Sequence, residues 1–369
     1  MNKIIYLIFS LFSIHLSAQI SGSLQFGGET RNFIYYVPQT LPPQAPMLVL
    51  VLHGATQDGP AIANVSNMHQ FTNSANAVVV YPDGISNSWN VGLSVGGSTA
   101  DDVGFLDALI DYFISEIGVD PQKLYSCGFS NGGYMSYKMA CESSHCFSAV
   151  ASVAGVMTQG MIDNCGDPGE TSIMHIHGTS DFIVSYNGSS FSGLSVQSVI
   201  DHWNNANNCG NVSTAIDIPN TNLTDFSTVE KTTWTDCQNN SEVILYRVDG
   251  GGHQWPDTEA VLGGVGAINR DINASEEIIS FFQNHSCASI QNTNNQELLN
   301  FLVYPNPTQD KIRISLPNNH SVRIEIKDLL GKTLFTKDVQ NNVDVNCQDW
   351  PTGIYLVCSS GQVEKFYKN

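Results

Sequence analysis

The chain has 369 residues, of which 42% are hydrophobic, and its formal net charge is −19. This length can form one large α/β domain and a smaller second domain. The negative charge repels nucleic acid and anionic membranes, so we expect neither as a partner and interpret the charge as a solubilising surface.

The N-terminus is typical of a secretion signal over residues 1–18. Met1–Lys3 carries a positive charge, and Ile4–Phe12 is apolar but too short to span a bilayer. Ser17–Ala18 provides the small residues of a cleavage site, so Gln19 is the expected first mature residue, give or take a residue or two. No later run is long and apolar enough to span a membrane. We therefore expect an exported chain without an integral membrane segment.

Apolar strand-like runs alternate with helical stretches from Leu24 to about Gln283. Met47–Leu52 and Ala77–Tyr81 are continuously apolar, as strands of a parallel sheet covered on both faces are. Further strands are predicted at Arg31–Val37, Lys123–Cys127, Ala149–Val153, Ser172–Ile176 and Val243–Val248, and helices at Val103–Ile117, Gly133–Ala140, Gln197–Asn205 and Ser275–Phe282. This alternation predicts an α/β domain at residues 19–285 with a doubly wound, mostly parallel sheet.

The pattern of apolar and polar residues changes after residue 285. Residues 286–300 are polar without periodicity, which is typical of a linker. Residues 301–369 then consist of short strands and turns and predict a small all-β sandwich. Its strands are expected at Ile312–Leu316, Val322–Lys327, Thr333–Val339, Gly353–Cys358 and Val363–Tyr367.

One serine stands in a special turn. The sequence Gly128–Gly132 has the G-x-S-x-G pattern and lies between a predicted strand and a predicted helix. A serine at such a junction is held in a tight turn that exposes its hydroxyl, and the glycines avoid clashes with the neighbouring elements. Ser130 is therefore the candidate nucleophile. Ser94 also fits the pattern, but no strand precedes it.

A nucleophilic serine needs a base and an acid that orients the base. In this kind of sheet they follow the serine in the order acid, histidine, each after a strand. Asp181 is the best acid and His253 the best base, because each comes just past a predicted strand. Asp249 and Asp225 are alternative acids. The other histidines near strand ends or helices are more typical of structural roles: His53, His175, His177, His202 and His285.

An oxyanion hole requires two fixed N–H donors. We expect one from Asn131, directly after the nucleophile, and one from Ala55, in the loop after Met47–Leu52; the alternative is that Gly54 only forms a tight turn. Trp89 and Trp255 are candidates for an aromatic wall that stacks on substrate. Ordinary core packing is the competing interpretation for both.

The nine cysteines of an exported chain are expected to form disulfides rather than a metal site. A bridge between Cys209 and Cys237 is the first prediction, and one between Cys141 and Cys146 is a weaker one. The odd number leaves at least one thiol free. Cys127, inside the strand before the nucleophile, is interpreted as a buried apolar residue.

Five motifs occur in order and together resemble a known group: Leu52–Gly54, Asp101–Leu106, Gly128–Gly133, His177–Asp181 and Gly251–Pro256. The chain is similar to the polyhydroxybutyrate depolymerase-type esterases, which include feruloyl and acetylxylan esterases of carbohydrate esterase family 1. The resemblance implies an α/β-hydrolase fold and the triad Ser130, Asp181 and His253. The chain has Ala55 where related sequences often have cysteine, and Asp257 where they often have glycine.

The C-terminal residues carry a second resemblance. Val303–Thr308, Leu329–Lys332, Gly353–Leu356 and the closing lysines 365 and 368 are similar to the C-terminal sorting domain of the type IX secretion system. This resemblance implies that the secretion machinery is a partner and that the chain is secreted or attached to the cell surface. The competing interpretation is a β-module that binds carbohydrate or another polymer.

These observations predict a secreted serine carboxylic ester hydrolase that works through an acyl-enzyme and needs no cofactor or metal. About 15 residues separate Val156 from Thr171, too few for a lipase lid, which favours an ester attached to a polymer. A polyhydroxybutyrate depolymerase-like activity is the first expectation, and a feruloyl or acetylxylan esterase acting on plant polysaccharide is the alternative. Two alternatives belong to other functional classes, a serine peptidase and a non-catalytic surface binding protein.

Overall fold

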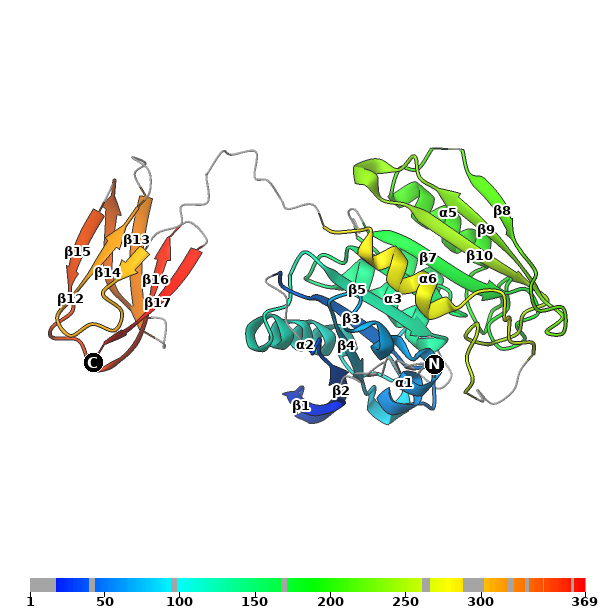
Figure 1. The fold of residues 1–369 in the computed structure, drawn as a ribbon, viewed down its shortest axis with the longest axis horizontal. Helices are drawn as coiled ribbons and strands as arrows, with labels where there is room; N and C mark the ends of the chain where they lie inside the picture. Colours follow the sequence, from blue (N-terminus) through cyan, green and yellow to red (C-terminus); the bar gives the residue numbers. More distant parts are fainter. Residues whose placement is uncertain are drawn as a thin grey trace, which may run out of the picture. The chain divides into compact units, whose positions relative to one another are not determined.

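The computed structural model describes residues 18–39, 44–93, 98–166, 171–210, 212–260, 266–287, 302–316, 322–328, 332–340, 342–359 and 362–368. The chain divides into two compact units, Met1–Ser289 and Ile290–Asn369 (Figure 1). The expected signal at residues 1–18 and linker at residues 286–300 fall almost wholly outside the described residues. None of the described helices is long and apolar enough to cross a bilayer.

The larger unit is built on one ten-stranded sheet with the order β1-β2-β4-β3-β5-β6-β7-β10-β9-β8. The six central strands, from β4 to β10 in this order, are parallel, and antiparallel pairs flank them on both sides. The strands are β1 Ile20–Phe26, β2 Glu29–Tyr36, β3 Met47–Leu52, β4 Ala77–Pro82, β5 Leu124–Phe129, β6 Ala149–Val153, β7 Ser172–Gly178, β8 Thr214–Ile218, β9 Thr228–Trp234 and β10 Val243–Asp249. This mostly parallel sheet confirms the predicted α/β-hydrolase fold class.

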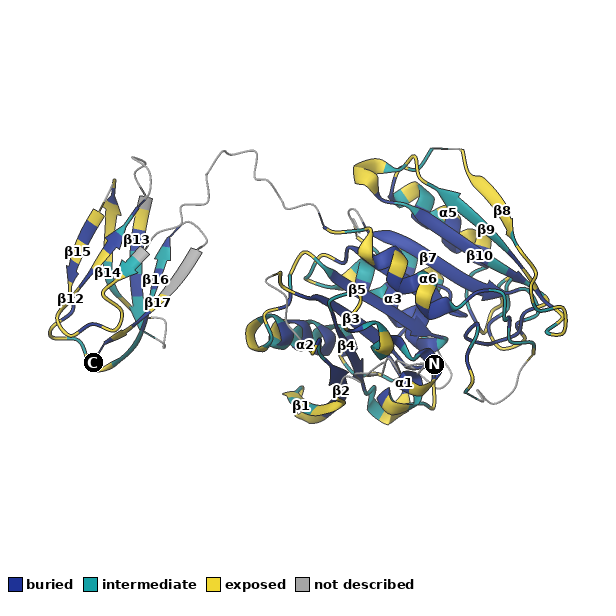
Figure 2. Cartoon of the chain, viewed as in Figure 1, coloured by how far each residue is buried: buried dark blue, intermediate teal, exposed yellow. Residues whose placement is uncertain are grey.

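Helices cover both faces of the sheet. They are α1 Gly59–Ser66, α2 Asp102–Glu116, α3 Asn131–Glu142, α4 Gln159–Asn164, α5 Val196–Ala206 and α6 Ala274–Gln283. Along β3, Leu48 and Leu50 belong to the core that includes α2, α3 and α5, whereas Val49 and Val51 belong to the core that includes α1 and α6. Each run of apolar residues therefore fills two cores at once, and Figure 2 shows the central strands buried.

A buried ion pair joins strand β2 to helix α2. Arg31 on β2 donates to Asp102 on α2 at 2.7 Å, and the side chains are 2% and 0% exposed. The second oxygen of Asp102 accepts the backbone N–H of Asn90 at 2.7 Å. Asp102 therefore holds together β2, α2 and the loop before α2.

The second unit consists of two antiparallel sheets, ordered β11-β12-β15 and β14-β13-β16-β17. Its strands are β11 Leu302–Tyr304, β12 Lys311–Ser315, β13 Val322–Asp328, β14 Thr333–Val339, β15 Asn342–Asn346, β16 Gly353–Ser359 and β17 Gln362–Lys368. Alternating side chains of the two sheets, such as Ile314 and Ile326, form one core. The five predicted strands are present, and β11 and β15 are additional.

Three disulfides join the larger unit. Cys209 is bonded to Cys237, as predicted. The prediction that Cys141 pairs with Cys146 is wrong, because Cys141 at the end of α3 bonds to Cys165 after α4, and Cys146 bonds to Cys287 after α6. Tertiary contacts between helices, rather than proximity in sequence, set these pairs. Cys127 is free and buried, as expected.

We predict that Asp102→Asn lowers the free energy of unfolding by about 3–5 kcal/mol, because it leaves the buried Arg31 charge without its carboxylate partner. The control Glu142→Gln removes a partly exposed ion pair with Lys138 within one helix and should cost about 0.5 kcal/mol or less. Urea unfolding followed by tryptophan fluorescence measures both, since four of the five tryptophans lie in the larger unit. Equal losses in the two variants would contradict the role given to Asp102.

Candidate active site

The turn between β5 and α3 holds Ser130 in a rare backbone conformation. Its φ is 52° and its ψ is −119°, although it is not glycine. The N–H of Ser130 donates to the carbonyl of Val153 on the neighbouring strand at 2.8 Å, and the carbonyl of Ser130 accepts from Gly133 and Tyr134 in α3. Such a conformation costs about 1–3 kcal/mol and persists only where the surrounding structure imposes it. The predicted strand, turn and helix are all present around Ser130.

Glycine at position 132 lets the first turn of α3 lie directly against β3. A Cβ atom at Gly132 would lie 2.0 Å from the carbonyl oxygen of Leu52 and 2.7 Å from that of His53. No side chain fits at this separation. The glycine therefore brings the Ser130 turn against the loop that follows β3.

Asp181 and His253 meet at the edge of the sheet where β7 and β10 end. The Nδ1 atom of His253 lies 2.7 Å from Oδ2 of Asp181, and both side chains are buried. The other carboxylate oxygen of Asp181 accepts the backbone N–H groups of Ile183 and Val184, each at 2.8 Å. The two residues are 72 positions apart in sequence, and the parallel pairing of β7 with β10 brings their loops together.

Hydrogen bonds keep the carboxylate of Asp181 ionised. Burial on its own would raise the pKa of Asp181, but hydrogen bonds from His177 and His253 hold that pKa well below the ordinary carboxyl value. An ionised carboxylate on Nδ1 fixes the orientation of His253 and leaves Nε2 as the ring nitrogen that can accept a proton.

Ser130 and His253 lie on neighbouring loops. The imidazole of His253 is 4.8 Å, between ring centroids, from Phe129, which directly precedes Ser130. Within the described residues, neither the Ser130 hydroxyl nor Nε2 of His253 has a hydrogen-bond partner, and the two do not bond to each other. Catalytic hydrogen bonds are often longer before substrate binds, so the missing bond is compatible with Ser130 as nucleophile and His253 as base.

Two backbone N–H groups beside Ser130 have no hydrogen-bond acceptor in the part of the chain that the structure describes. The turn Gly54–Gln57 closes through a bond from the Gln57 N–H to the Gly54 carbonyl at 3.2 Å, and Thr56 has a φ of 66°. The N–H groups of Gly54, Thr56 and Gln57 all have acceptors, whereas within the described residues the N–H of Ala55 has none. The N–H of Asn131 likewise has no partner there. These are the two donors that the sequence predicts for an oxyanion hole.

The two predicted aromatic wall residues lie in the core instead. Trp89 is 0% and Trp255 is 1% exposed. The indole N–H of Trp89 donates to the carbonyl of His53 at 3.0 Å, and that of Trp255 donates to the hydroxyl of Ser275 at 3.1 Å. This burial favours the packing interpretation over the stacking wall. Trp89 nevertheless contacts a residue next to Ser130, because its backbone N–H donates to the side-chain oxygen of Asn131 at 2.7 Å.

The residues that the sequence offers as alternatives for the base and the acid bind other partners. His53 accepts the N–H of Gly84 through Nε2 at 2.8 Å. Asp249 pairs with Arg247, and Asp225 accepts from Ser227 and from the backbone of Arg270. Ser94 lies outside the described residues. Within the described residues, no group of three or more His, Cys, Asp or Glu side chains could hold a metal ion.

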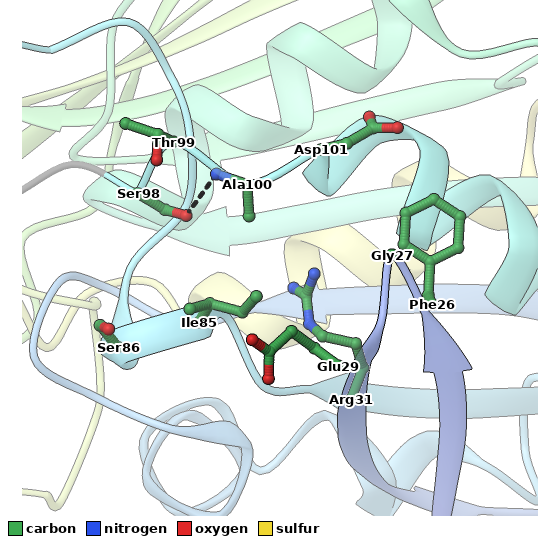
Figure 3. Close-up of a pocket in the computed structure, with 10 residues that line it drawn as sticks. All are labelled: Phe26, Gly27, Glu29, Arg31, Ile85, Ser86, Ser98, Thr99, Ala100 and Asp101. Carbon is green, nitrogen blue, oxygen red and sulfur yellow. Dashed lines mark hydrogen bonds between the residues drawn. The ribbon is translucent and has the colours of Figure 1, made fainter.

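Two open cavities lie among the loops at this edge of the sheet. One of about 480 Å³ is lined by residues of β1, β2 and the loops before α2: Phe26, Gly27, Glu29, Arg31, Ile85, Ser86 and Ser98–Asp101 (Figure 3). It is close to the Ala55 turn, because Asn87, next to Ser86, accepts the N–H of Thr56 at 2.8 Å.

The other cavity, of about 570 Å³, is lined by Gly92, Leu93, Thr158, Gln159, Ser189–Phe191, Gly193 and Leu194. The wall of this cavity is tied to the first turn of α3. The hydroxyl of Tyr134, four residues after Ser130, donates to the carbonyl of Ser192. The cavity therefore lies on the Ser130 side of the sheet edge and is a candidate for the substrate pocket.

Two family models match parts of the chain. Residues 302–369 match the secretion system C-terminal sorting domain, and residues 64–167 match the prolyl oligopeptidase family. The second match includes Ser130 and ends before Asp181. The chain thus carries a C-terminal sorting domain, which implies export.

Curated relatives are similar to parts of the chain. NocK of Nocardia uniformis subsp. tsuyamanensis, a protein named as an esterase, is 24% identical over 69% of this chain and 79% of its own length. The bifunctional acetylxylan esterase/xylanase XynS20E of Neocallimastix patriciarum is 29% identical over 43% of this chain and 22% of its own length. Feruloyl esterase B of Piromyces equi is 28% identical over 49% and 34%. The chain spans about a third or less of the last two relatives.

Among solved structures, the acetyl xylan esterase from Aspergillus awamori superposes with a TM-score of 0.48 at 16% identity, over 71% of this chain and 98% of that one.

We predict that Ser130→Ala lowers kcat by on the order of 10⁶, as removal of a triad serine does. The control Ser94→Ala, at the other G-x-S-x-G serine, should retain activity close to the original. Initial rates on p-nitrophenyl acetate measure both variants. Loss of activity in Ser94→Ala with full activity in Ser130→Ala would overturn the assignment of the nucleophile.

We predict that Ala55→Pro lowers kcat by about 10²–10³, because it deletes one oxyanion donor. Ala55 occupies the second position of a turn whose third residue has positive φ, a position that accepts proline. The variant therefore removes the N–H and keeps the turn. Thr56→Gly changes the same turn but keeps the donor, and should remain active; equal activity of Ala55→Pro and Thr56→Gly would exclude this N–H from catalysis.

Proposed function

We propose that the protein is an exported serine carboxylic ester hydrolase that works through an acyl-enzyme. The observation that carries the proposal is the strained Ser130 turn next to the buried Asp181–His253 pair, with the N–H groups of Ala55 and Asn131 beside it, neither of which has an acceptor among the described residues. The relatives named as esterases support an ester as the substrate.

In this proposal the hydroxyl of Ser130 attacks the ester carbonyl and Nε2 of His253 takes its proton. The N–H groups of Ala55 and Asn131 bind the oxyanion of the tetrahedral intermediate. The proton then passes from His253 to the leaving alcohol, and the acyl group stays on Ser130. Water attacks the acyl-enzyme while Nε2 of His253 takes its proton, and this proton passes to the Ser130 oxygen as the bond to the acyl group breaks and the acid leaves. Asp181 stabilises the imidazolium in both steps.

The substrate we propose is an ester attached to a polymer. Aromatic side chains stand exposed on the loops around the site: Phe182, next to Asp181, is 81% exposed, and Phe191, at the cavity of about 570 Å³, is 85% exposed. Rings of this kind can contact an aromatic acyl group or the surface of an insoluble polymer. The relatives favour feruloyl or acetyl esters of plant polysaccharide. A polyhydroxyalkanoate polyester is the competing substrate.

The sorting domain fits this substrate, because an exported esterase reaches polymers that a cell cannot import. The proposal covers both an enzyme that is released from the cell and one that stays attached to the cell surface. Export by the type IX secretion machinery would use the C-terminal unit, and the catalytic residues all lie in the larger unit.

A serine peptidase is the second candidate, and the match of residues 64–167 to the prolyl oligopeptidase family favours it. Both candidates would use the same nucleophile, acid and base. They differ in the leaving group, which is an alcohol for the esterase and an amine for the peptidase.

The test is a substrate panel of methyl ferulate, acetylated xylan, a hydroxybutyrate oligomer and a chromogenic peptide. We predict hydrolysis of at least one of the three esters, and no hydrolysis of the peptide at a comparable kcat/KM. Ser130→Ala, assayed in parallel, excludes contaminating enzymes. Cleavage of the peptide alone would replace the esterase by the peptidase, and inactivity on the whole panel would favour a binding protein.

A further inference from the structure

A chain of buried polar side chains leads from the core of the larger unit to Asp181. The hydroxyl of Tyr137 on α3 lies 2.6 Å from Nδ1 of His175, and Nε2 of His175 lies 3.1 Å from Nδ1 of His177. All three side chains are fully buried, with exposures of 0%, 0% and 1%. The planes of the two imidazole rings are nearly parallel, with 6° between them. The proposed mechanism assigns none of these residues a role.

This series of hydrogen-bonded side chains ends on the loop that holds Asp181. Nε2 of His177 lies 2.8 Å from the carbonyl oxygen of Val184 and 3.4 Å from Oδ2 of Asp181. The backbone N–H of Val184 donates to Oδ1 of the same carboxylate at 2.8 Å. His177 thus binds both the carboxylate and the short segment that clamps it.

These contacts allow one arrangement of protons when both rings are neutral. The carbonyl of Val184 can only accept, so Nε2 of His177 must carry the hydrogen and its Nδ1 must accept. Nε2 of His175 must then donate, and its Nδ1 accepts the hydroxyl hydrogen of Tyr137. Burial lowers the pKa of His175 well below its ordinary value, in agreement with a neutral ring. Every donor in the chain therefore points toward Asp181.

We propose that Tyr137, His175 and His177 form a positioning chain that fixes the tautomer of His177 and thereby holds Asp181 in place against His253. The proposal rests on the proposed function, because it assigns the chain a role in the same triad. The opposite tautomer of His177 would turn a lone pair toward two oxygen atoms, the Val184 carbonyl and Oδ2 of Asp181. That repulsion would displace the Asp181 loop and with it the imidazole of His253.

The test compares two substitutions at His177. His177→Leu removes the donor to Asp181 and Val184, and we expect kcat to fall about tenfold to hundredfold with KM little changed, since a displacement of about 1 Å can cost that much. His177→Gln keeps an N–H donor of similar reach and should recover most of the loss. A merely structural role predicts instead that both variants lose stability without this difference in kcat.

A second pair of variants guards against failure to fold. Tyr137→Phe removes one hydroxyl and keeps the ring, so we expect a loss of kcat in the same direction as His177→Leu. Tyr125→Phe is the matched control, because Tyr125 is also buried and its hydroxyl also donates one hydrogen bond, to the carbonyl of His285 away from the triad. Equal kcat in these two variants, with an active original enzyme, would overturn the proposal.

A readout that is independent of activity is the protonation of the rings. In protein with ¹⁵N-labelled histidine at neutral pH, we expect His175 and His177 to carry hydrogen on Nε2 only. An Nδ1–H tautomer or an imidazolium at either residue would contradict the positioning chain. If the original enzyme hydrolysed no ester, the proposed function would fail, and the ring spectra would still decide the direction of the chain.

Discussion

The backbone of Ser130 is the constraint on which the rest of the site depends. A positive φ at a serine is unfavourable by about 1–3 kcal/mol, so the surrounding packing must impose it. The bond from Ser130 to Val153 and the contact of Gly132 with the end of β3 do so, because they fix the turn between two strands and a helix. In the proposed mechanism this conformation presents the hydroxyl of Ser130 to the substrate, next to the Asn131 N–H, which has no acceptor among the described residues.

Parallel pairing of the central strands supplies the other half of the site. The carboxyl ends of β5, β7 and β10 lie along one edge of the sheet, so residues from three distant parts of the sequence meet there. Asp181 is then held by two backbone N–H groups and by His253, and its low pKa follows from these bonds. The proposed catalytic residues therefore depend on the sheet for their placement.

Much of this arrangement could be predicted from the sequence, and the reasons differ from part to part. The continuous apolar run Met47–Leu52 predicts burial on both faces, and the structure confirms it. The order of Ser130, Asp181 and His253 after three strands predicts their proximity. The disulfide of Cys141 could not be predicted, because its partner is set by the packing of two helices. The burial of Trp89 was equally out of reach, since a tryptophan in a loop is compatible with a wall or a core.

The series of hydrogen bonds from Tyr137 to Asp181 was the least accessible to sequence analysis, because histidines at strand ends give no sign of which ring nitrogen faces which partner.

The most direct test of the central claim is labelling with an alkyl fluorophosphonate, followed by peptide mass spectrometry. The account predicts one adduct, on Ser130, that forms far more slowly when His253 is replaced by alanine. Stoichiometric labelling at another serine, or labelling of Ser130 at an unchanged rate without His253, would contradict it.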